Sequence, residues 1–264
     1  MKSTSDKILL DKRAGVGWLI INNPERRNAI SLEMWEAMGS AFQAFEKDAE
    51  VRCVVMCGVG DKAFASGADI SQFEKHRSDA DAAEAYGTIS KGVRRQMIAF
   101  EKPLIAMIRG FCMGGGLGIA MTADLRIAAD DAVFGIPAAR LSIAYDFLNL
   151  SNLVHLVGPA KAKEILLTAR RFDANEALQM GLVNAVVPVA ELDAAIGELT
   201  DRLVDNAPLS LKASKLTIDE VVKDAGERDM ARIEDLSRAC FDSEDYAEGR
   251  AAFMEKREPT FRGR

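Results

Sequence analysis

The sequence contains few of the residues that usually hold metals or activate nucleophiles. Its 264 residues include two histidines, His76 and His155, and four cysteines without a Cys-x-x-Cys pair. Because no cluster of cysteine, histidine and acidic residues occurs at ligand spacing, a zinc site is not expected. The absence of a Gly-x-Ser-x-Gly segment likewise argues against a serine hydrolase of the α/β type.

The sequence also lacks a surplus of positive charge and any long apolar run. Its net charge of −6 and isoelectric point near 5.2 argue against nucleic acid as the main partner. No apolar run reaches the length of a membrane span, and residues 1–11 show no signal-peptide pattern. Cys53 and Cys57 lie in an apolar run, as reduced core cysteines do. We therefore expect a cytoplasmic globular protein that binds neither nucleic acid nor membranes.

Glycine is concentrated in one segment, residues 103–124. An apolar run over Leu104 to Ile108 predicts a buried strand, and residues 119–123 predict a helix. Three consecutive glycines lie between them, so this turn presents unpaired backbone N–H groups at the positive end of a helix dipole. The pattern indicates a backbone site for an anion or an oxyanion; the alternative is close packing of a helix on a sheet. The glycines are Gly110, Gly114, Gly115, Gly116 and Gly118.

Strands and helices alternate along the first 190 residues, which predicts an α/β core with a largely parallel sheet. From Val189 the pattern is helical nearly to the C-terminus, so we expect a core over residues 1–190 and a helical part over residues 191–264. The expected strands cover residues 8–10, 17–22, 53–57, 104–108, 125–128, 133–134 and 183–187. The expected helices before Val189 cover residues 32–47, 80–99, 119–123, 160–168 and 174–180.

A second glycine turn, Ser66-Gly67-Ala68-Asp69, follows an apparent dinucleotide-binding pattern. Gly58-Val-Gly60-Asp-Lys-Ala63 matches Gly-x-Gly-x-x-Ala, but the residues after it are typical of a strand rather than the helix that this motif requires. We interpret the match as accidental. Two turns thus each offer a bare N–H, one near Ala68 and one near Gly115.

Six segments follow one another in an order and spacing that are specific when taken together. They are Asn23-Pro-Glu-Arg-Arg-Asn-Ala-Ile30, Lys62-Ala-Phe-Ala-Ser-Gly-Ala-Asp-Ile70, Gly110-Phe-Cys-Met-Gly-Gly-Gly116, Ala169-Arg-Arg-Phe-Asp-Ala-Asn-Glu-Ala177, Met180-Gly-Leu-Val-Asn184 and Ala252-Phe-Met-Glu-Lys-Arg257. With them the chain resembles the crotonase family, also called the enoyl-CoA hydratase/isomerase family, over nearly its whole length. The resemblance implies an α/β superhelix of ββα units with two roughly perpendicular sheets. It also implies a helical C-terminal part that forms a homotrimer or a dimer of trimers.

The same resemblance implies an acyl-CoA substrate, with coenzyme A as part of the substrate and no permanently bound cofactor or metal. The thioester oxygen would lie between the backbone N–H groups of Ala68 and Gly115. The residues implied to hold coenzyme A are Arg26, Ser66, Ala68, Asp69, Ile70, Ser71 and, from a neighbouring subunit, Phe253 and Lys256. The residues implied to line the acyl group are Met113, Gly114, Gly115, Leu117, Gly118 and Ala138. Taken alone, Arg26 and Lys256 are also typical of solvated surface charges, and family hydratases often carry a lysine where Ser71 stands.

The chain departs from the family pattern at the residues that move protons. Hydratases of the family use two glutamates, and Gly118 and Ala138 occupy those positions here. Neither residue can transfer a proton, so the acid/base pair for hydration is missing. Tyr145 and Asp146 lie where other branches keep catalytic groups: an aspartate in dienoyl-CoA isomerases and chlorobenzoyl-CoA dehalogenases, and a tyrosine in a methylmalonyl-CoA decarboxylase branch. The alternatives are a helix N-cap ahead of residues 147–156 for Asp146 and a core position for Tyr145.

These features predict an enzyme that stabilises a thioester enolate and uses Asp146 or Tyr145 for proton transfer in an isomerase, decarboxylase or lyase reaction. Three alternatives stay open: a hydratase with a displaced base, a thioester hydrolase, and a CoA-binding protein with little catalysis. The acyl group and the choice between trimer and hexamer are left open by the sequence.

Overall fold

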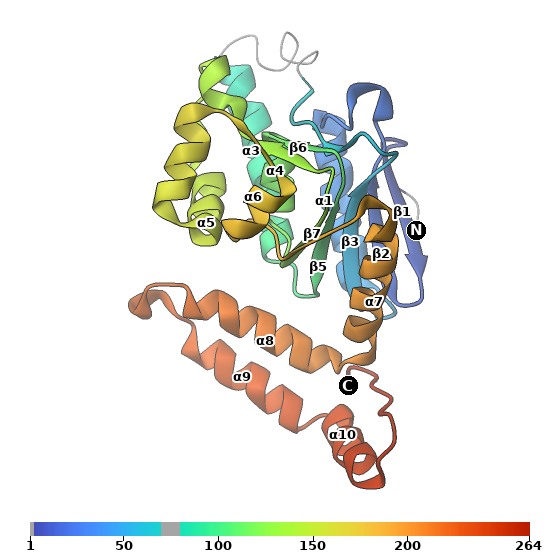
Figure 1. The fold of residues 1–264 in the computed structure, drawn as a ribbon. Coiled ribbons are helices and arrows are strands. Elements are labelled where there is room, and N and C mark those ends of the chain that lie inside the picture. Colours follow the sequence, from blue (N-terminus) through green and yellow to red (C-terminus); the bar gives the residue numbers. More distant parts are fainter. Residues whose placement is uncertain (1–2, 70–79) are drawn as a thin grey trace.

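A six-stranded sheet forms the centre of the protein (Figure 1). The computed structural model describes residues 3–69 and 80–264. Ile70 and Ser71, which were predicted to contact coenzyme A, lie outside these ranges. The strand order is β1-β2-β3-β5-β7-β10, and every neighbouring pair is parallel except the β1–β2 hairpin. The strands are β1 (Ile8–Arg13), β2 (Val16–Ile21), β3 (Cys53–Gly58), β5 (Leu104–Ile108), β7 (Leu125–Ala129) and β10 (Ala185–Val187).

Both faces of this sheet are covered, because its inner strands are apolar on both sides. Val54 and Met56 pack into a core with helices α1 (Leu32–Lys47) and α3 (Ala80–Ile98). Cys53 and Val55, which point to the other face, pack against helix α7 (Leu192–Asp205). The alternation of side chains along a strand therefore places two helical layers around one sheet.

A second sheet of four short strands, in the order β4-β6-β8-β9, positions the glycine turns. Its strands are β4 (Ala63–Ala65), β6 (Phe111–Met113), β8 (Val133–Gly135) and β9 (Arg171–Asp173). Because β4 and β6 are parallel neighbours, the turns that follow them lie side by side. The chain continues from β3 directly into strand β4, which confirms that the dinucleotide-like pattern is accidental.

The remaining helices lie partly beside the two sheets and partly in a separate C-terminal group. They are η1 (Pro24–Arg26), α4 (Gly115–Ala120), η3 (Pro137–Leu141), α5 (Phe147–Thr168), α6 (Ala174–Gln179), η4 (Val189–Glu191), α8 (Pro208–Val221), η5 (Ala225–Glu227), α9 (Met230–Phe241) and α10 (Glu244–Glu255). In Figure 1, α8, α9 and α10 project away from the sheets. Lys215 ties α8 back to the core through a 2.8 Å ion pair with Asp124. In the described part of the chain, no helix is both long and apolar enough to cross a bilayer.

Most predicted elements are confirmed, the strand at Leu104–Ile108 and the helix at Leu32–Lys47 to the residue. The predicted bounds of the helix at the glycines are wrong. This helix begins at Gly115 and ends at Ala120 instead of covering residues 119–123. The last strand begins at Ala185, two residues later than predicted. The predicted start of a new helix after Gly158 is confirmed. The structure shows it as a kink inside α5, where Gly158 has the non-helical φ of 74°.

Candidate active site

Two backbone N–H groups face the same small space between the glycine turns. A Cβ built on Gly67 would lie 3.6 Å from the nitrogen of Gly115, and one built on Gly115 would lie 3.6 Å from the nitrogen of Ala68. Gly115 is the first residue of α4, where an N–H has no partner within the helix. Among the described residues, neither the Ala68 nor the Gly115 N–H donates a hydrogen bond. The arrangement suits an incoming oxygen that carries negative charge.

Neighbouring backbone fixes both turns in place. Ile30 donates its N–H to the carbonyl of Gly67 at 2.8 Å, and Gly114 donates to the carbonyl of Gly135 at 2.8 Å. A Cβ on Gly116 would lie 2.2 Å from the carbonyl oxygen of Ala65, so only glycine lets α4 approach β4 this closely. The two donors are therefore oriented before any ligand arrives.

The donors open into a cavity of about 360 Å³. The turns contribute Ala68 and Gly115, helix α1 contributes Trp35, and η3 contributes Ala138. Further lining comes from α3 and from the residues at the start of α5. The cavity therefore lies where five separate elements meet.

Tyr145 lies against the first turn of α4. Its hydroxyl donates to the carbonyl oxygen of Gly114 at 3.2 Å, and its oxygen lies 3.4 Å from where a Cβ on Gly118 would stand. Burial raises the pKa of Tyr145 above its usual range. The side chain therefore stays neutral at physiological pH, with its hydroxyl hydrogen donated to the Gly114 carbonyl.

Asp146 caps helix α5, as the sequence suggested, and also binds α3. Its Oδ1 accepts from the N–H of Asn149 at 3.2 Å. Its Oδ2 accepts from Nδ2 of Asn149 at 2.6 Å and pairs with the guanidinium of Arg94 at 3.2 Å. Oδ1 thus caps α5 while Oδ2 holds the start of α5 against α3, and Asp146 also lines the cavity.

The wall formed by α1 and α3 contains side chains that the sequence analysis did not single out for the site. The indole N–H of Trp35 donates to the Tyr86 hydroxyl at 3.0 Å, and that hydroxyl lies 3.4 Å from the carbonyl oxygen of Ile30. The guanidinium of Arg94 lies 5.3 Å from the centre of the Trp35 ring. Asn149 was also missed, although its spacing from Asp146 is a helix-start signal.

Three residues predicted to hold coenzyme A come together beside the first turn. Arg26 pairs with Asp69 at 3.1 Å, and the Ser66 hydroxyl donates to the carbonyl of Arg26 at 3.1 Å. Ser66 also lines the cavity. The Arg26 side chain is half exposed while Asp69 is buried, so a cation stands at the surface near the Ala68 N–H.

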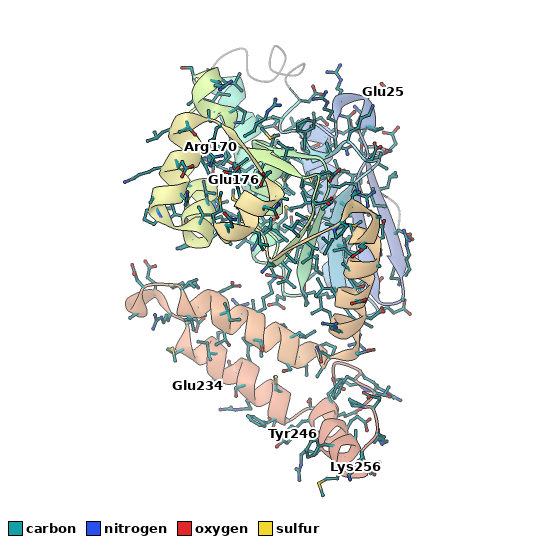
Figure 2. The ribbon with its side chains drawn as sticks, in the orientation of Figure 1. Glu25, Arg170, Glu176, Glu234, Tyr246 and Lys256 are labelled. Carbon is teal, nitrogen blue, oxygen red and sulfur yellow. The ribbon has the colours of Figure 1, made fainter. Side chains whose placement is uncertain are left out.

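The other two such residues, Phe253 and Lys256, are not brought to this place within one chain. Figure 2 labels Glu25, the neighbour of Arg26, and Lys256 at opposite ends of the molecule. Lys256 is the C-cap of α10. Phe253 is exposed and lines a separate cavity of about 570 Å³ among the C-terminal helices. Contact with the Ala68 turn therefore requires a second subunit.

The residues predicted to line the acyl group divide into two sets. Gly114, Gly115 and Ala138 line the cavity. Leu117 and Gly118 are buried in the protein interior. The end of the Met113 side chain packs against Gly135, 2.9 Å from the position that a Cβ on that glycine would take. Met113, Leu117 and Gly118 are not among the lining residues. Over the described residues, no group of three or more His, Cys, Asp or Glu side chains could hold a metal ion.

Comparisons with known proteins agree on one family. A family model described as enoyl-CoA hydratase/isomerase matches residues 11–264. A crotonyl-CoA hydratase of Syntrophomonas wolfei is 37% identical over 256 residues, 97% of this chain and 98% of that protein. A short-chain-enoyl-CoA hydratase of Clostridium acetobutylicum is 35% identical over 252 residues, 96% of either chain. The crystal structure of an enoyl-CoA hydratase/carnithine racemase from Magnetospirillum magneticum has a TM-score of 0.94 at 35% identity, covering 99% of this chain and 97% of that one.

Proposed function

This chain belongs to the enoyl-CoA hydratase/isomerase family, and we propose that it stabilises the enolate of an acyl-CoA thioester and protonates it from Tyr145. The observation that carries the proposal is the pair of neighbouring N–H groups at Ala68 and Gly115, which donate to nothing among residues 3–69 and 80–264, with a neutral tyrosine hydroxyl at the same turn. The reaction is of the isomerase, decarboxylase or lyase type.

The two N–H groups would accelerate the reaction by binding the enolate oxygen more strongly than the neutral thioester oxygen. Because the turns are fixed by Ile30 and Gly135, the donors need no reorganisation as charge develops. Coenzyme A would lie along Arg26, Ser66 and Asp69, continuing over Ile70 and Ser71.

Tyr145 suits the role of proton donor better than Asp146. Its hydroxyl is protonated at neutral pH, and Tyr145 lines the same cavity as Ala68 and Gly115. The carboxylate of Asp146 already accepts from Asn149 and Arg94. Asp146 would therefore position the start of α5 and supply a second acceptor in the cavity.

The proposal is tested by turnover in D₂O of crotonyl-CoA, a dienoyl-CoA and a malonyl-type thioester. We expect an activated thioester to give a product with deuterium at the α-carbon. The variant Gly115→Pro should slow this reaction by at least about 10²–10³-fold, the usual cost of one oxyanion donor, because proline removes that N–H and places its Cδ where the thioester oxygen would bind; the ring itself is tolerated at the first helical position. Absence of acyl-CoA binding by folded protein would refute the proposal.

A second candidate, a hydratase with a displaced base, is favoured by the names of the two similar hydratases. The positions of the family glutamates hold Gly118 and Ala138, so we expect crotonyl-CoA hydration several orders of magnitude below a typical family hydratase, since acid and base each contribute about 10²–10⁴-fold. Brisk hydration that falls in Asp146→Asn or Tyr145→Phe would favour the displaced base. Brisk hydration unchanged by both would place the base elsewhere.

We also propose a homotrimer or dimer of trimers in the cytoplasm, with residues 191–264 serving assembly and covering coenzyme A. Support comes from large apolar side chains exposed on α8 to α10, such as Ile218, Val221, Phe241, Phe253 and Met254. Assembly would also bring Phe253 and Lys256 to a neighbouring Ala68 turn. Light scattering that showed a stable monomer would contradict this assignment.

A further inference from the structure

A short backbone pairing sets the direction of the Ala68 N–H. Ile30 and Ala68 form an isolated parallel β-bridge. The N–H of Ile30 donates to the carbonyl of Gly67 at 2.8 Å, and the N–H of Asp69 donates to the carbonyl of Ile30 at 2.9 Å. Because successive N–H groups of an extended chain point to opposite sides, the Ala68 N–H points away from Ile30. A shift of the Ile30 backbone would therefore turn this N–H relative to that of Gly115.

The same pairing also strengthens the Ala68 N–H as a donor. The Gly67 carbonyl and the Ala68 N–H belong to one peptide group, and a hydrogen bond accepted at one end of a peptide group strengthens the bond donated at the other. The Ile30 N–H shares its own peptide group with the Ala29 carbonyl. Nδ2 of the buried Asn23 donates to that carbonyl at 2.8 Å. Three donors therefore act in series, from the Asn23 amide through Ile30 to Ala68.

Two aromatic side chains reach the Ile30 carbonyl from helices α1 and α3. The indole N–H of Trp35 donates to the Tyr86 hydroxyl at 3.0 Å. An indole nitrogen can only donate, so the Tyr86 oxygen accepts there and its hydrogen is directed to the Ile30 carbonyl, 3.4 Å away. This second contact is long for two oxygens, so its contribution should be modest. Trp35, Tyr86 and Ile30 are all buried, which keeps water from replacing these bonds.

We propose that Asn23 and Tyr86 are positioning residues for the oxyanion donor at Ala68, acting through the two peptide groups that meet at Ile30. This inference rests on the proposed function, because it takes the enolate oxygen to bind at Ala68. Asn23 strengthens the donor from one side of Ile30, and Tyr86 holds the Ile30 carbonyl from the other. Both act on the backbone, and neither has to touch the reacting atoms.

The ionisation of bound acetoacetyl-CoA tests the inference, because this β-keto thioester forms an enolate that absorbs in the ultraviolet. In the wild type, the pKa of the bound ligand should lie below that of the free ligand. Tyr86→Phe and Asn23→Leu should each raise the pKa of the bound ligand by about 0.5–1, since one hydrogen bond is typically worth about three- to tenfold. On the best activated thioester, kcat should fall by the same factor, while KM changes by less than about twofold.

Gln96→Met is the matched control. Nε2 of Gln96, on α3, donates to the carbonyl of Gly39, on α1, at 2.9 Å, and Gln96 does not line the cavity. The variant therefore breaks an amide-to-carbonyl bond between the two helices without touching Ile30, and should leave the pKa of the bound ligand unchanged.

Asn23 and Tyr86 lie in different segments, so either variant suffices if the other does not fold. A pKa of the bound ligand that stayed unchanged in every folded variant, or that rose equally in the Gln96→Met control, would overturn the inference alone. A wild type that did not lower the pKa of acetoacetyl-CoA would instead overturn the proposed function.

Discussion

The cavity has two walls that are built from different parts of the chain. One wall is backbone: the N–H groups of Ala68 and Gly115 project from turns held by hydrogen bonds to Ile30 and Gly135. The other wall is made of side chains at the start of α5, where Tyr145 and Asp146 meet α4 and α3. The first wall depends on strand pairing and close packing, and the second on which side chains stand at a few positions.

In the proposed function, this difference separates activation of a thioester from the choice of reaction. An oxyanion site made of backbone N–H groups keeps its geometry as long as β4, β6 and α4 keep their places. Both departures from the hydratase pattern, Gly118 and Ala138, adjoin the side-chain wall: Ala138 lines the cavity and Gly118 abuts Asn149. Substitutions in the backbone wall should therefore affect folding or stabilisation of the enolate, and those in the side-chain wall should affect proton transfer.

The largest effect is expected at Tyr145. Tyr145→Phe removes the proposed proton donor and should slow protonation of the enolate by about 10²–10⁴-fold, while KM stays nearly unchanged because the N–H donors remain. Steady-state kinetics on the best activated thioester measures this split. Ser40→Ala, which removes an exposed hydroxyl from α1, should keep full activity. A rise in KM that explained the whole loss would place Tyr145 in binding rather than catalysis.

The next largest effect is expected where the backbone wall is tightest. Gly116→Ala should cost more than about 3 kcal/mol of unfolding free energy, beyond the usual range for overpacking, because the new Cβ meets the backbone oxygen of Ala65 at 2.2 Å. Gly118→Ala is the comparison, because Gly118 lies on α4 but faces the side-chain wall. Its Cβ meets the end of the Asn149 side chain at 2.8 Å and should cost about 1–2 kcal/mol. Urea denaturation measures both, and equal losses would remove the distinction between the walls.

A smaller effect separates two aspartate caps. Asp173→Ala removes the capping box of α6 and should cost about 1 kcal/mol. Asp146→Ala removes the cap of α5 and also the carboxylate that pairs with the buried Arg94, so the loss should reach about 2–3 kcal/mol. Activity should fall only in Asp146→Ala. If the two variants lost the same stability, the contact between Asp146 and Arg94 would contribute nothing measurable.

The backbone wall was the more predictable one, because its signals are local. Leu104–Ile108 is a short apolar run closed by glycine, and Ser31 is a helix cap that accepts from the N–H of Met34. The glycine helix was misplaced because helix propensity favours the residues after it. The close approach of Gly116 to Ala65 decides its true start, and that contact joins segments about 50 residues apart.

The side-chain wall was predicted only at Tyr145 and Asp146. Trp35 and Tyr86 lie on two separate amphipathic helices, and only tertiary packing joins them through the 3.0 Å hydrogen bond. The amide of Asn149 is oriented by Asp146, whose Oδ2 accepts from Nδ2 at 2.6 Å. No periodicity encodes that orientation, since it follows from acceptors and donors meeting in three dimensions.

The smallest predicted effect tests whether the side-chain wall shields the Tyr145 hydroxyl from water. Burial raises the pKa of Tyr145 in the folded protein, whereas the unfolded chain titrates near 10. Below pH 10 both states keep the proton, so this group adds no pH dependence there. Above pH 10 the unfolded state binds fewer protons, so stability falls as pH rises. Relative to Tyr145→Phe, the wild type should lose about 0.8 kcal/mol between pH 8 and pH 10.5. Urea denaturation of both proteins at the two pH values measures this difference, in which all other titrating groups cancel. A difference that did not change with pH would mean that water solvates the hydroxyl.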